Sequence, residues 1–186
     1  DADLAREASG LHDSGHLLAH LQSIRAFLIP TDGSGQTCRL HELPRSRFKD
    51  HFVRTAPEEA RQVLLRSANW CWQHGEQDEA MSYALEAQAW DLAAPWLAAC
   101  MPDIAQKQGE LQLALHWMNS IPADWLDRYP QIRIDYAFAL SFFPQKPEVA
   151  TQLRALQAIR QRLAQSVAPD ARTIDQIDCA MAFQRV

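Results

Sequence analysis

Three short stretches of the sequence hold residue types that could do chemistry. The first is "RLHELPR" at residues 39–45, which resembles the start of an H-E-x-x-H zinc-protease helix. In that motif two histidines one turn apart bind zinc and the glutamate activates water. Here Arg45 stands where the second histidine would be, and Pro44 would break a helix that carried the motif in its interior. The sequence therefore does not support a zinc-protease site, and the role of His41 needs another explanation.

The second stretch is "HDSGHLLAH", in which His12, His16 and His20 recur with a spacing of four. Such a spacing places successive imidazoles on one face of a helix, where they could chelate a metal ion. Ser14 and Gly15 indicate that the helix begins only there, which leaves His12 outside it. We therefore expect histidines at the polar edge of an amphipathic helix, and no metal site.

The third stretch is "TDGSGQT" at residues 31–37. A phosphate-binding P-loop needs G-x-x-x-x-G-K followed by Ser or Thr, and the lysine is absent. Ser34 also has the wrong spacing for the nucleophile motif G-x-S-x-G. No paired carboxylates, activated nucleophile or metal set is found elsewhere, so we expect no catalytic residues, no cofactor bound by the chain alone, and no enzyme activity.

Composition and charge narrow the class of protein further. The chain has 186 residues, 47% hydrophobic and 22% charged, with six Trp and only six Gly, which favours a globular and mainly helical protein. Its net charge of -5 argues against a nucleic-acid binder. Four widely spaced cysteines predict reduced, mostly buried thiols in the cytoplasm, and no segment reads as a membrane span or signal peptide. The start without Met and the end within a helical pattern suggest a piece of a longer protein.

Residues 1–55 have the pattern of the second half of a winged-helix unit. A helix is predicted over 14–26 with Ser14 as N-cap. "AFLIP" and "QTCRL" flank the turn-rich "TDGSG", which predicts a β-hairpin. A second helix is expected from near Pro44, with Phe48, Phe52 and Val53 on one side.

Residues 56–186 are expected to be helical throughout. "GEQDEAMSYAL" from Gly75 and "GELQLALHWMN" from Gly109 align at a period of 34, with Ala80 opposite Ala114. This period and this order of Gly, Ala and large residues are typical of tetratricopeptide-like helical hairpins. Helices bounded by prolines follow to the end of the chain. The predicted fold is therefore mainly α, with a partial winged-helix unit followed by a tetratricopeptide-like array.

The tryptophans give one candidate binding surface. Most of the six occupy apolar positions of predicted helices, which favours packing in the core. Trp70 and Trp72 are only two residues apart, so they cannot both face one side of a helix. If the chain has a surface for a partner or effector, these two residues are the candidates for it.

Three segments in this order carry a resemblance to a known family. They are "FLIPTDGSGQTCRLHELPRSRFKDHF", "LLRSANWCWQHGEQDEAMSYALEAQAWDLAAPWL" and "GELQLALHWMNSIPADWLDRYPQIRIDYAFAL". Together they resemble the large ATP-binding LuxR-type transcriptional regulators of the MalT class. The resemblance implies that this chain is the central part of a cytoplasmic regulator, with an ATPase module before it and a LuxR-type helix-turn-helix after it. DNA would be bound only through that further domain, and ATP or ADP by the parent protein, which leaves room for a weak ATPase there.

The resemblance also suggests a role for the end of the hairpin. In related signal-transduction ATPases, a His followed by an acidic residue and Leu contacts bound ADP and holds the inactive state. His41, Glu42 and Leu43 match that pattern, and Arg39 matches the Arg-x-His that closes the hairpin, so Arg39 and His41 are the nucleotide-sensing candidates. Cys38 departs from the family pattern, where an aromatic residue is common, and so do Pro44 and Arg45.

The sequence is compatible with two functions. In the first, the chain links nucleotide state to a small-molecule inducer or regulatory protein that binds the helical part. In the second, it is a tetratricopeptide-like adaptor whose concave helical face binds a peptide. A Walker motif and a LuxR helix-turn-helix in the surrounding protein would favour the first.

Overall fold

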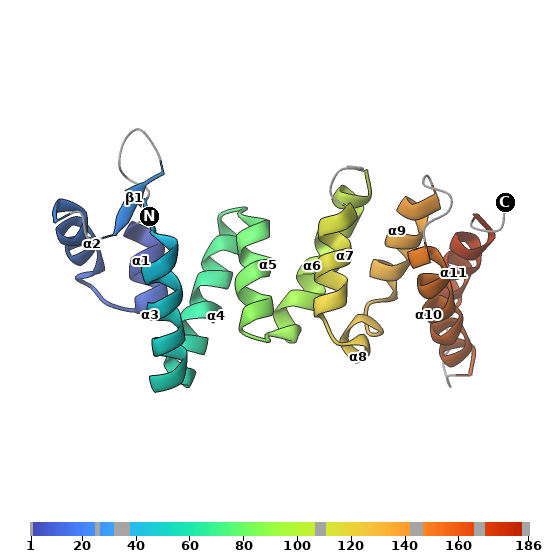
Figure 1. The fold of residues 1–186 in the computed structure, drawn as a ribbon. Coiled ribbons are helices and arrows are strands. Elements are labelled where there is room, and N and C mark those ends of the chain that lie inside the picture. The colour runs from blue at the N-terminus through green and yellow to red at the C-terminus, as the bar shows by residue number, and fades with distance from the viewer. Residues whose placement is uncertain are drawn as a thin grey trace. The chain divides into compact units, whose positions relative to one another are not determined.

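The computed structural model describes residues 2–24, 27–31, 38–106, 111–141, 147–165 and 170–183. This described part consists of helices and a single two-stranded antiparallel sheet (Figure 1). Contacts divide the chain into two compact units, Asp1–Ala89 (unit 1) and Trp90–Val186 (unit 2). The predicted mainly α fold with one hairpin is confirmed. The predicted boundary after residue 55 separates a winged-helix domain from a helical domain. The division into compact units does not test it, so it stays a prediction.

Unit 1 is organised around one long helix. Its elements are α1 (Ala2–Ser9), α2 (Ser14–Ser23), β1 (Leu28–Pro30), β2 (Cys38–Leu40), α3 (Glu42–Thr55), α4 (Pro57–Gln73) and α5 (Gln77–Glu86). Helix α4 packs against α1, α3 and α5. Arg66 of α4 donates from Nε to the carbonyl of Ala8 at 2.8 Å, so it binds one of the carbonyls that α1 leaves free at its end.

The start of α2 differs by one residue from the prediction. Asp13 is the N-cap and Ser14 is the first helical residue. The amide of Ser14 donates to the carbonyl of Leu11 at 3.2 Å, so the preceding turn already draws Ser14 into the helix. Its hydroxyl is buried with no hydrogen-bond partner rather than capping the helix. Helix α2 ends at Ser23, and residues 25 and 26 of the predicted helix lie outside the described residues.

The predicted hairpin is confirmed by its register. Leu28 pairs with Leu40, and Ile29 pairs with Arg39, in antiparallel strands. The predicted tip at residues 32–37 lies outside the described residues.

Helix α3 begins at Glu42, two residues before Pro44. Pro44 therefore lies in the first turn, where no helical acceptor for its missing N–H exists, so the helix tolerates it. Phe48 and Phe52 are one turn apart and both exposed. The prediction that Val53 shares their side is wrong, because Val53 lies beside Lys49 in a cleft against α4.

Helices α4 and α5 end in the same way with different residues. After α4, Glu76 donates its amide to the carbonyl of Cys71 at 2.9 Å, and Gly75 has a φ of 80°. After α5, Ala89 donates to the carbonyl of Ala84 at 2.9 Å, and Gln88 has a φ of 53°. Both are Schellman motifs, whose left-handed position normally favours glycine. Gln88 therefore adopts a conformation that is strained for its type.

Substitutions at Gly75 and Gln88 test whether the backbone of Gln88 is strained. Gly75→Ala should lower the free energy of unfolding by about 1 kcal/mol, and Gln88→Gly should raise it by up to about 1 kcal/mol. Gly15→Ala is the control, because Gly15 lies inside α2 with open space around an added Cβ, so alanine should stabilise there. Urea unfolding of the four proteins measures the differences. A loss of stability in Gln88→Gly would contradict the strain.

Unit 2 consists of six described helices around α9. They are α6 (Trp90–Gln106), α7 (Leu111–Ser120), α8 (Ala123–Leu126), α9 (Pro130–Ser141), α10 (Pro147–Ala164) and α11 (Ala171–Phe183). Helix α9 contacts each of the others. Where α9, α10 and α11 meet, Leu156 and Ile177 are fully buried in an apolar cluster. Three of these helices begin at or close to a proline, as the sequence predicts.

The repeat identified in the sequence has a packing role in both units. Ala80 on α5 and Ala114 on α7 are each 0% exposed. Helix α5 packs on α4, and α7 packs on α6, so a small side chain stands where paired helices approach closely. Trp117 is buried and Tyr83 is half-buried, while Gly109 lies outside the described residues.

Candidate functional site

His41 lies at the junction of hairpin and helix, as predicted. It is the N-cap residue of α3, with extended backbone angles (φ -56°, ψ 143°). Its amide donates to the carbonyl of Phe27 at 2.7 Å, and its carbonyl accepts from the amide of Arg45 at 3.0 Å. The imidazole makes no capping hydrogen bond and is exposed. The backbone thus fixes the position of His41 while the ring stays available to a ligand.

Arg39 lies two residues earlier on β2. Its side chain is exposed, whereas Cys38 and Leu40 on either side are half-buried. This alternation follows the strand period of two and points Arg39 away from the packed side of the hairpin. Arg39 and His41 are therefore two exposed polar side chains close together in the sequence, as a pair of contacts to a phosphate would require.

Large exposed apolar side chains are concentrated in the first part of unit 1. Ten such residues occur in the described part of the chain, and nine of them lie between residues 11 and 53. We call these nine the exposed apolar group: Leu11, Leu17, Ile24, Phe27, Ile29, Leu43, Phe48, Phe52 and Val53. Phe48 is 58% exposed and Leu43 is 73% exposed. Within this group Phe48 and Phe52 are neighbours one turn apart on α3, and exposed apolar side chains that lie together are typical of a surface that another protein part covers.

Trp70 and Trp72 do not form one surface. Both lie near the end of α4 and both are half-buried. The ring of Trp70 stacks on the imidazole of His74, with centroids 3.8 Å apart and planes at 17°. His74 Nδ1 also lies 2.7 Å from the carbonyl oxygen of Trp70. Because residues two apart on a helix point in different directions, the stacked pair and Trp72 belong to different sides of α4.

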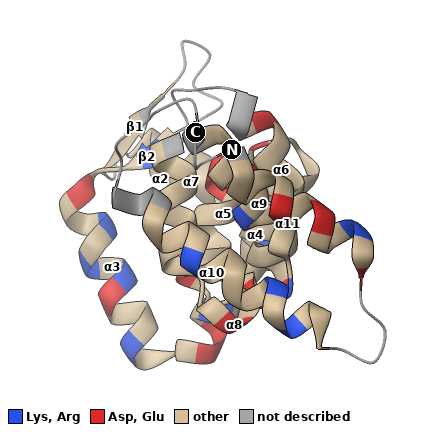
Figure 2. Ribbon diagram, turned by 90° about the vertical axis from the view of Figure 1, so that its right-hand side faces the viewer, with Lys and Arg blue, Asp and Glu red and all other residues tan. Residues whose placement is uncertain are grey.

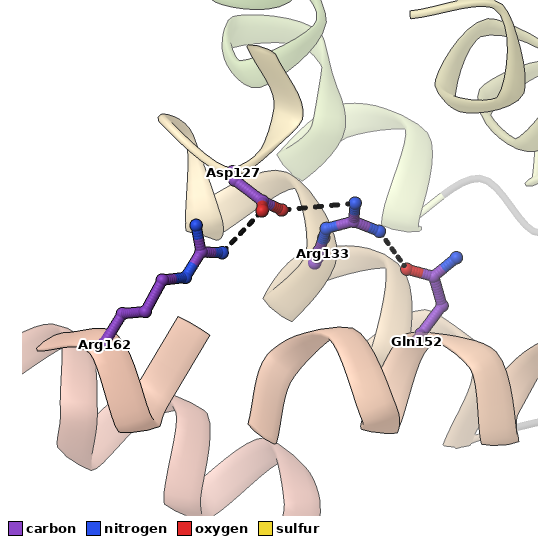
Figure 3. Close-up of polar contacts among 4 residues, drawn as sticks. All are labelled: Asp127, Arg133, Gln152 and Arg162. Carbon is purple, nitrogen blue, oxygen red and sulfur yellow. Dashed lines mark hydrogen bonds and ion pairs between the residues drawn. The ribbon is translucent and has the colours of Figure 1, made fainter. Parts of the chain in front are cut away.

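A polar network that the sequence reading missed lies in unit 2 (Figure 3). Arg133 on α9 is buried, at 8% exposure. It donates from Nη1 to Gln152 Oε1 at 3.1 Å and from Nη2 to Asp127 Oδ1 at 3.4 Å. Asp127 also accepts from Arg162 of α10. The network ties the turn after α8 to both α9 and α10.

A second charged residue of α9, Asp135, is partly buried two residues after Arg133. Asp135 accepts from Gln131 Nε2 at 2.6 Å through Oδ1, while its Oδ2 is buried without a partner. Burial raises the pKa of Asp135, and the Gln131 hydrogen bond opposes that rise. The signal in the sequence is "IRIDYAFAL", in which one basic and one acidic residue interrupt an apolar run. No pattern on α9 alone shows that both are covered, because other helices do the covering.

The cysteines differ in environment, and none is in a disulfide within the described residues. Cys71 and Cys100 are buried, Cys38 is half-buried and Cys179 is exposed, so the expectation of mostly buried thiols holds for two of the four. Burial, followed by the Glu76 carboxylate, raises the pKa of Cys71 from 9.0 to about 11.

This pKa predicts a loss of stability at high pH. Because the folded state keeps the Cys71 proton, the stabilisation is fully present below pH 9 and is lost as the pH rises through 11. The two-unit difference corresponds to at most about 3 kcal/mol. The unfolding free energy of the native chain should therefore fall more between pH 9 and pH 11 than that of Cys71→Ala.

Thiol labelling at pH 8 should modify Cys179 first and Cys71 only on unfolding. Equal labelling rates at the two cysteines would contradict the burial of Cys71.

In the described ranges, no group of three or more His, Cys, Asp or Glu residues is arranged to hold a metal ion, and His16 and His20 on α2 are both exposed. None of the helices in those ranges is both long and apolar enough to cross a lipid bilayer.

The fold places the chain in a class of protein in which a winged-helix part leads into paired helices. His41 lies in that part, where the hairpin meets α3. Residues 1–67 match the family model described as the MalT winged helix domain. The chain is related to the MalT-like, LuxR-type transcriptional regulators, and the resemblance predicted from the sequence is confirmed.

Named relatives support the same relationship. The chain is 26% identical over 153 residues to the HTH-type transcriptional regulator AlkS of Alcanivorax borkumensis, which covers 82% of this chain and 16% of that protein. It is 25% identical over 139 residues to AlkS of Pseudomonas putida, covering 75% and 16%, and 26% identical over 128 residues to AlkS of Ectopseudomonas oleovorans, covering 69% and 14%. The chain thus spans only a small part of each relative. No solved structure matches it significantly.

Proposed function

We propose that the chain is the signal-coupling part of an ATP-dependent transcriptional regulator. In this role it joins the nucleotide state of an ATPase module in the same protein to an effector and to a DNA-binding domain. The chain itself has no catalytic role. The match of residues 1–67 to a MalT winged helix domain and the similarity to AlkS regulators support the proposal.

The exposed apolar group is the observation that carries the proposal. Phe48 and Phe52 lie one turn apart on α3 and are 58% and 39% exposed, and within the described residues α3 packs on α4 by its other side. Exposed phenyl rings lower the free energy when another apolar surface covers them, by about 25 cal/mol for each Å² buried. An ATPase module in the same protein would supply that surface.

His41 and Arg39 would then face the nucleotide held by that module. An imidazole or guanidinium can donate a hydrogen bond to a phosphate oxygen, and such charge-assisted bonds are strong. The residue favours whichever nucleotide state brings an oxygen within reach, so it biases the equilibrium between inactive and active forms.

The helical part would receive the second signal. An inducer or regulatory protein at Trp70 or Trp72 shifts the equilibrium only if it binds one form more tightly than the other. A tetratricopeptide-like adaptor is the second candidate function, which the paired helices and the buried Ala80 and Ala114 favour. ATP binding by the full-length protein separates the two, because an adaptor needs none.

Substitution of His41 in the full-length regulator tests the nucleotide role. Loss of a hydrogen bond to a charged phosphate removes about 1.5–3 kcal/mol from the inactive state. His41→Ala should therefore raise basal reporter transcription by roughly tenfold to a hundredfold. His51→Ala is the matched control, because His51 is exposed like His41 but lies within α3 rather than at its N-cap. Unchanged basal and induced activity in a folded His41→Ala protein would contradict the role.

A further inference from the structure

A cleft of about 660 Å³ lies within unit 1 where α3, α4 and the end of α5 meet. Ala60 and Leu64 of α4 form its apolar floor, and Val53 of α3 extends this surface. The volume is in the range of small-molecule sites. None of the residues singled out by the sequence as sensing or binding candidates lines it.

The charges around this cleft are incompletely paired. Figure 2 shows basic and acidic positions along α3. Lys49 of α3 is paired with Glu86 of α5 at 2.8 Å, which leaves Asp50, Arg54 and Arg61. In the described part of the chain, no carboxylate lies within ion-pair distance of either arginine. The cleft thus has a net positive charge in a chain whose net charge is -5.

Arg61 is held in place by the opposite wall. Its Nε donates to the carbonyl of Ala87 at 3.3 Å, just after α5 ends. That bond uses one of the five N–H groups of the guanidinium, and the terminal nitrogens remain for a ligand. Arg54 lines the same cleft from the last turn of α3. Each of the two guanidinium groups that line this cleft carries a planar fork of N–H donors, which suits the two oxygens of a carboxylate.

Gln88 adds an independent observation. It lines the cleft and holds the left-handed φ of 53°, in the same Schellman position that Gly75 occupies after α4. Strained residues of this kind are found preferentially at binding sites, where the side chain has a use that offsets the strain. A glutamine amide beside two arginines is a further donor for an anion.

We propose that this cleft binds a small organic acid, with its carboxylate between Arg54, Arg61 and Gln88 and its apolar body on Val53, Ala60 and Leu64. The remaining carboxylate, Asp50, favours a singly charged ligand over a doubly charged one. This site is separate from the nucleotide role of His41 and does not depend on it.

Titration of the chain with sodium hexanoate at constant ionic strength, followed by amide NMR shifts, tests the proposal. We expect saturable shifts at the amides of residues 54–56 and 58–61 and of Gln88, with a dissociation constant on the order of 1 mM. Acetate and inorganic phosphate lack the apolar body and should bind at least about tenfold more weakly.

Variants identify the groups responsible. Arg54→Gln should weaken hexanoate binding by about tenfold or more. Gln88→Gly should weaken it at least about threefold without a loss of stability, so it keeps the test decisive if Arg54→Gln fails to fold. Arg154→Gln is the control, because Arg154 lies on α10 in the other unit. His41→Ala should bind hexanoate normally.

Other results would contradict the proposed site. Shifts that do not saturate, or equal binding of phosphate and hexanoate, would show counter-ion association only. Unchanged affinity in both Arg54→Gln and Gln88→Gly would overturn the site. None of these measurements involves a nucleotide, so they can fail while the role of His41 stands.

Discussion

Replacing Asp127 with alanine is expected to lower the free energy of unfolding by about 3–5 kcal/mol, because it leaves a buried arginine without its carboxylate. The side chain of Arg133 is only 10% exposed, and that of Asp127 is 22% exposed. In Asp127→Ala the guanidinium keeps one partner, the Gln152 amide oxygen, and its Nε already has none. A buried charge in that state costs far more than a lost surface ion pair.

The substitution of the other partner should be much milder. Arg133→Met removes the charge together with its unpartnered Nε and keeps an apolar side chain of similar length, so the loss should stay below about 1.5 kcal/mol. The double variant Asp127→Ala/Arg133→Met should then be more stable than Asp127→Ala alone. Chemical unfolding of the three variants measures this asymmetry.

An exposed pair in the same unit supplies the control. Arg160 binds Asp178 through two nitrogens, at 2.5 and 2.9 Å, with both side chains about two-fifths exposed. The hydrogen bonds from Arg160 lower the pKa of Asp178. Asp178→Ala should nevertheless change stability far less than Asp127→Ala, because water solvates what remains. Equal losses in the two variants would mean that burial of Arg133 does not set the effect.

Local patterns in the sequence were sufficient to predict the hairpin and the paired helices. The turn-rich "TDGSG" between "AFLIP" and "QTCRL" predicts the paired strands, and Gly75 with Ala80 predicts a helix end and a close packing position. These features depend on neighbouring residues, so they can be read directly from the sequence. The nucleotide role of His41 and the partner surface at Trp70 and Trp72 are not tested by the fold and stay predictions.

Features that depend on distant segments were not predictable in this way. Arg133 of α9 is buried because α10 and the turn after α8 pack over it. No periodic pattern in the sequence of α9 predicts this burial. Val53 faces a cleft because the end of α5 meets α3 there. The N-cap of α2 is Asp13 rather than Ser14 because a turn at Leu11 starts the helix early.

The second large effect is expected at the packing of α4 against α5. Met81 of α5 is 0% exposed, and Met81→Ala should lower the free energy of unfolding by about 2–5 kcal/mol, since it leaves a cavity in the core of unit 1. Phe48→Ala removes a larger side chain from the same unit, yet we expect a loss below about 1 kcal/mol because the ring is 58% exposed.

This comparison also tests the basis of the proposed function. If the free chain buried Phe48 against itself, Phe48→Ala would destabilise it as much as Met81→Ala does, and α3 would have no surface to offer another module. If Phe48 is exposed as described, thermal unfolding of the isolated chain should hardly change in Phe48→Ala. In the full-length regulator the same substitution should then weaken the contact with the ATPase module and alter basal transcription, because the apolar area is buried only there.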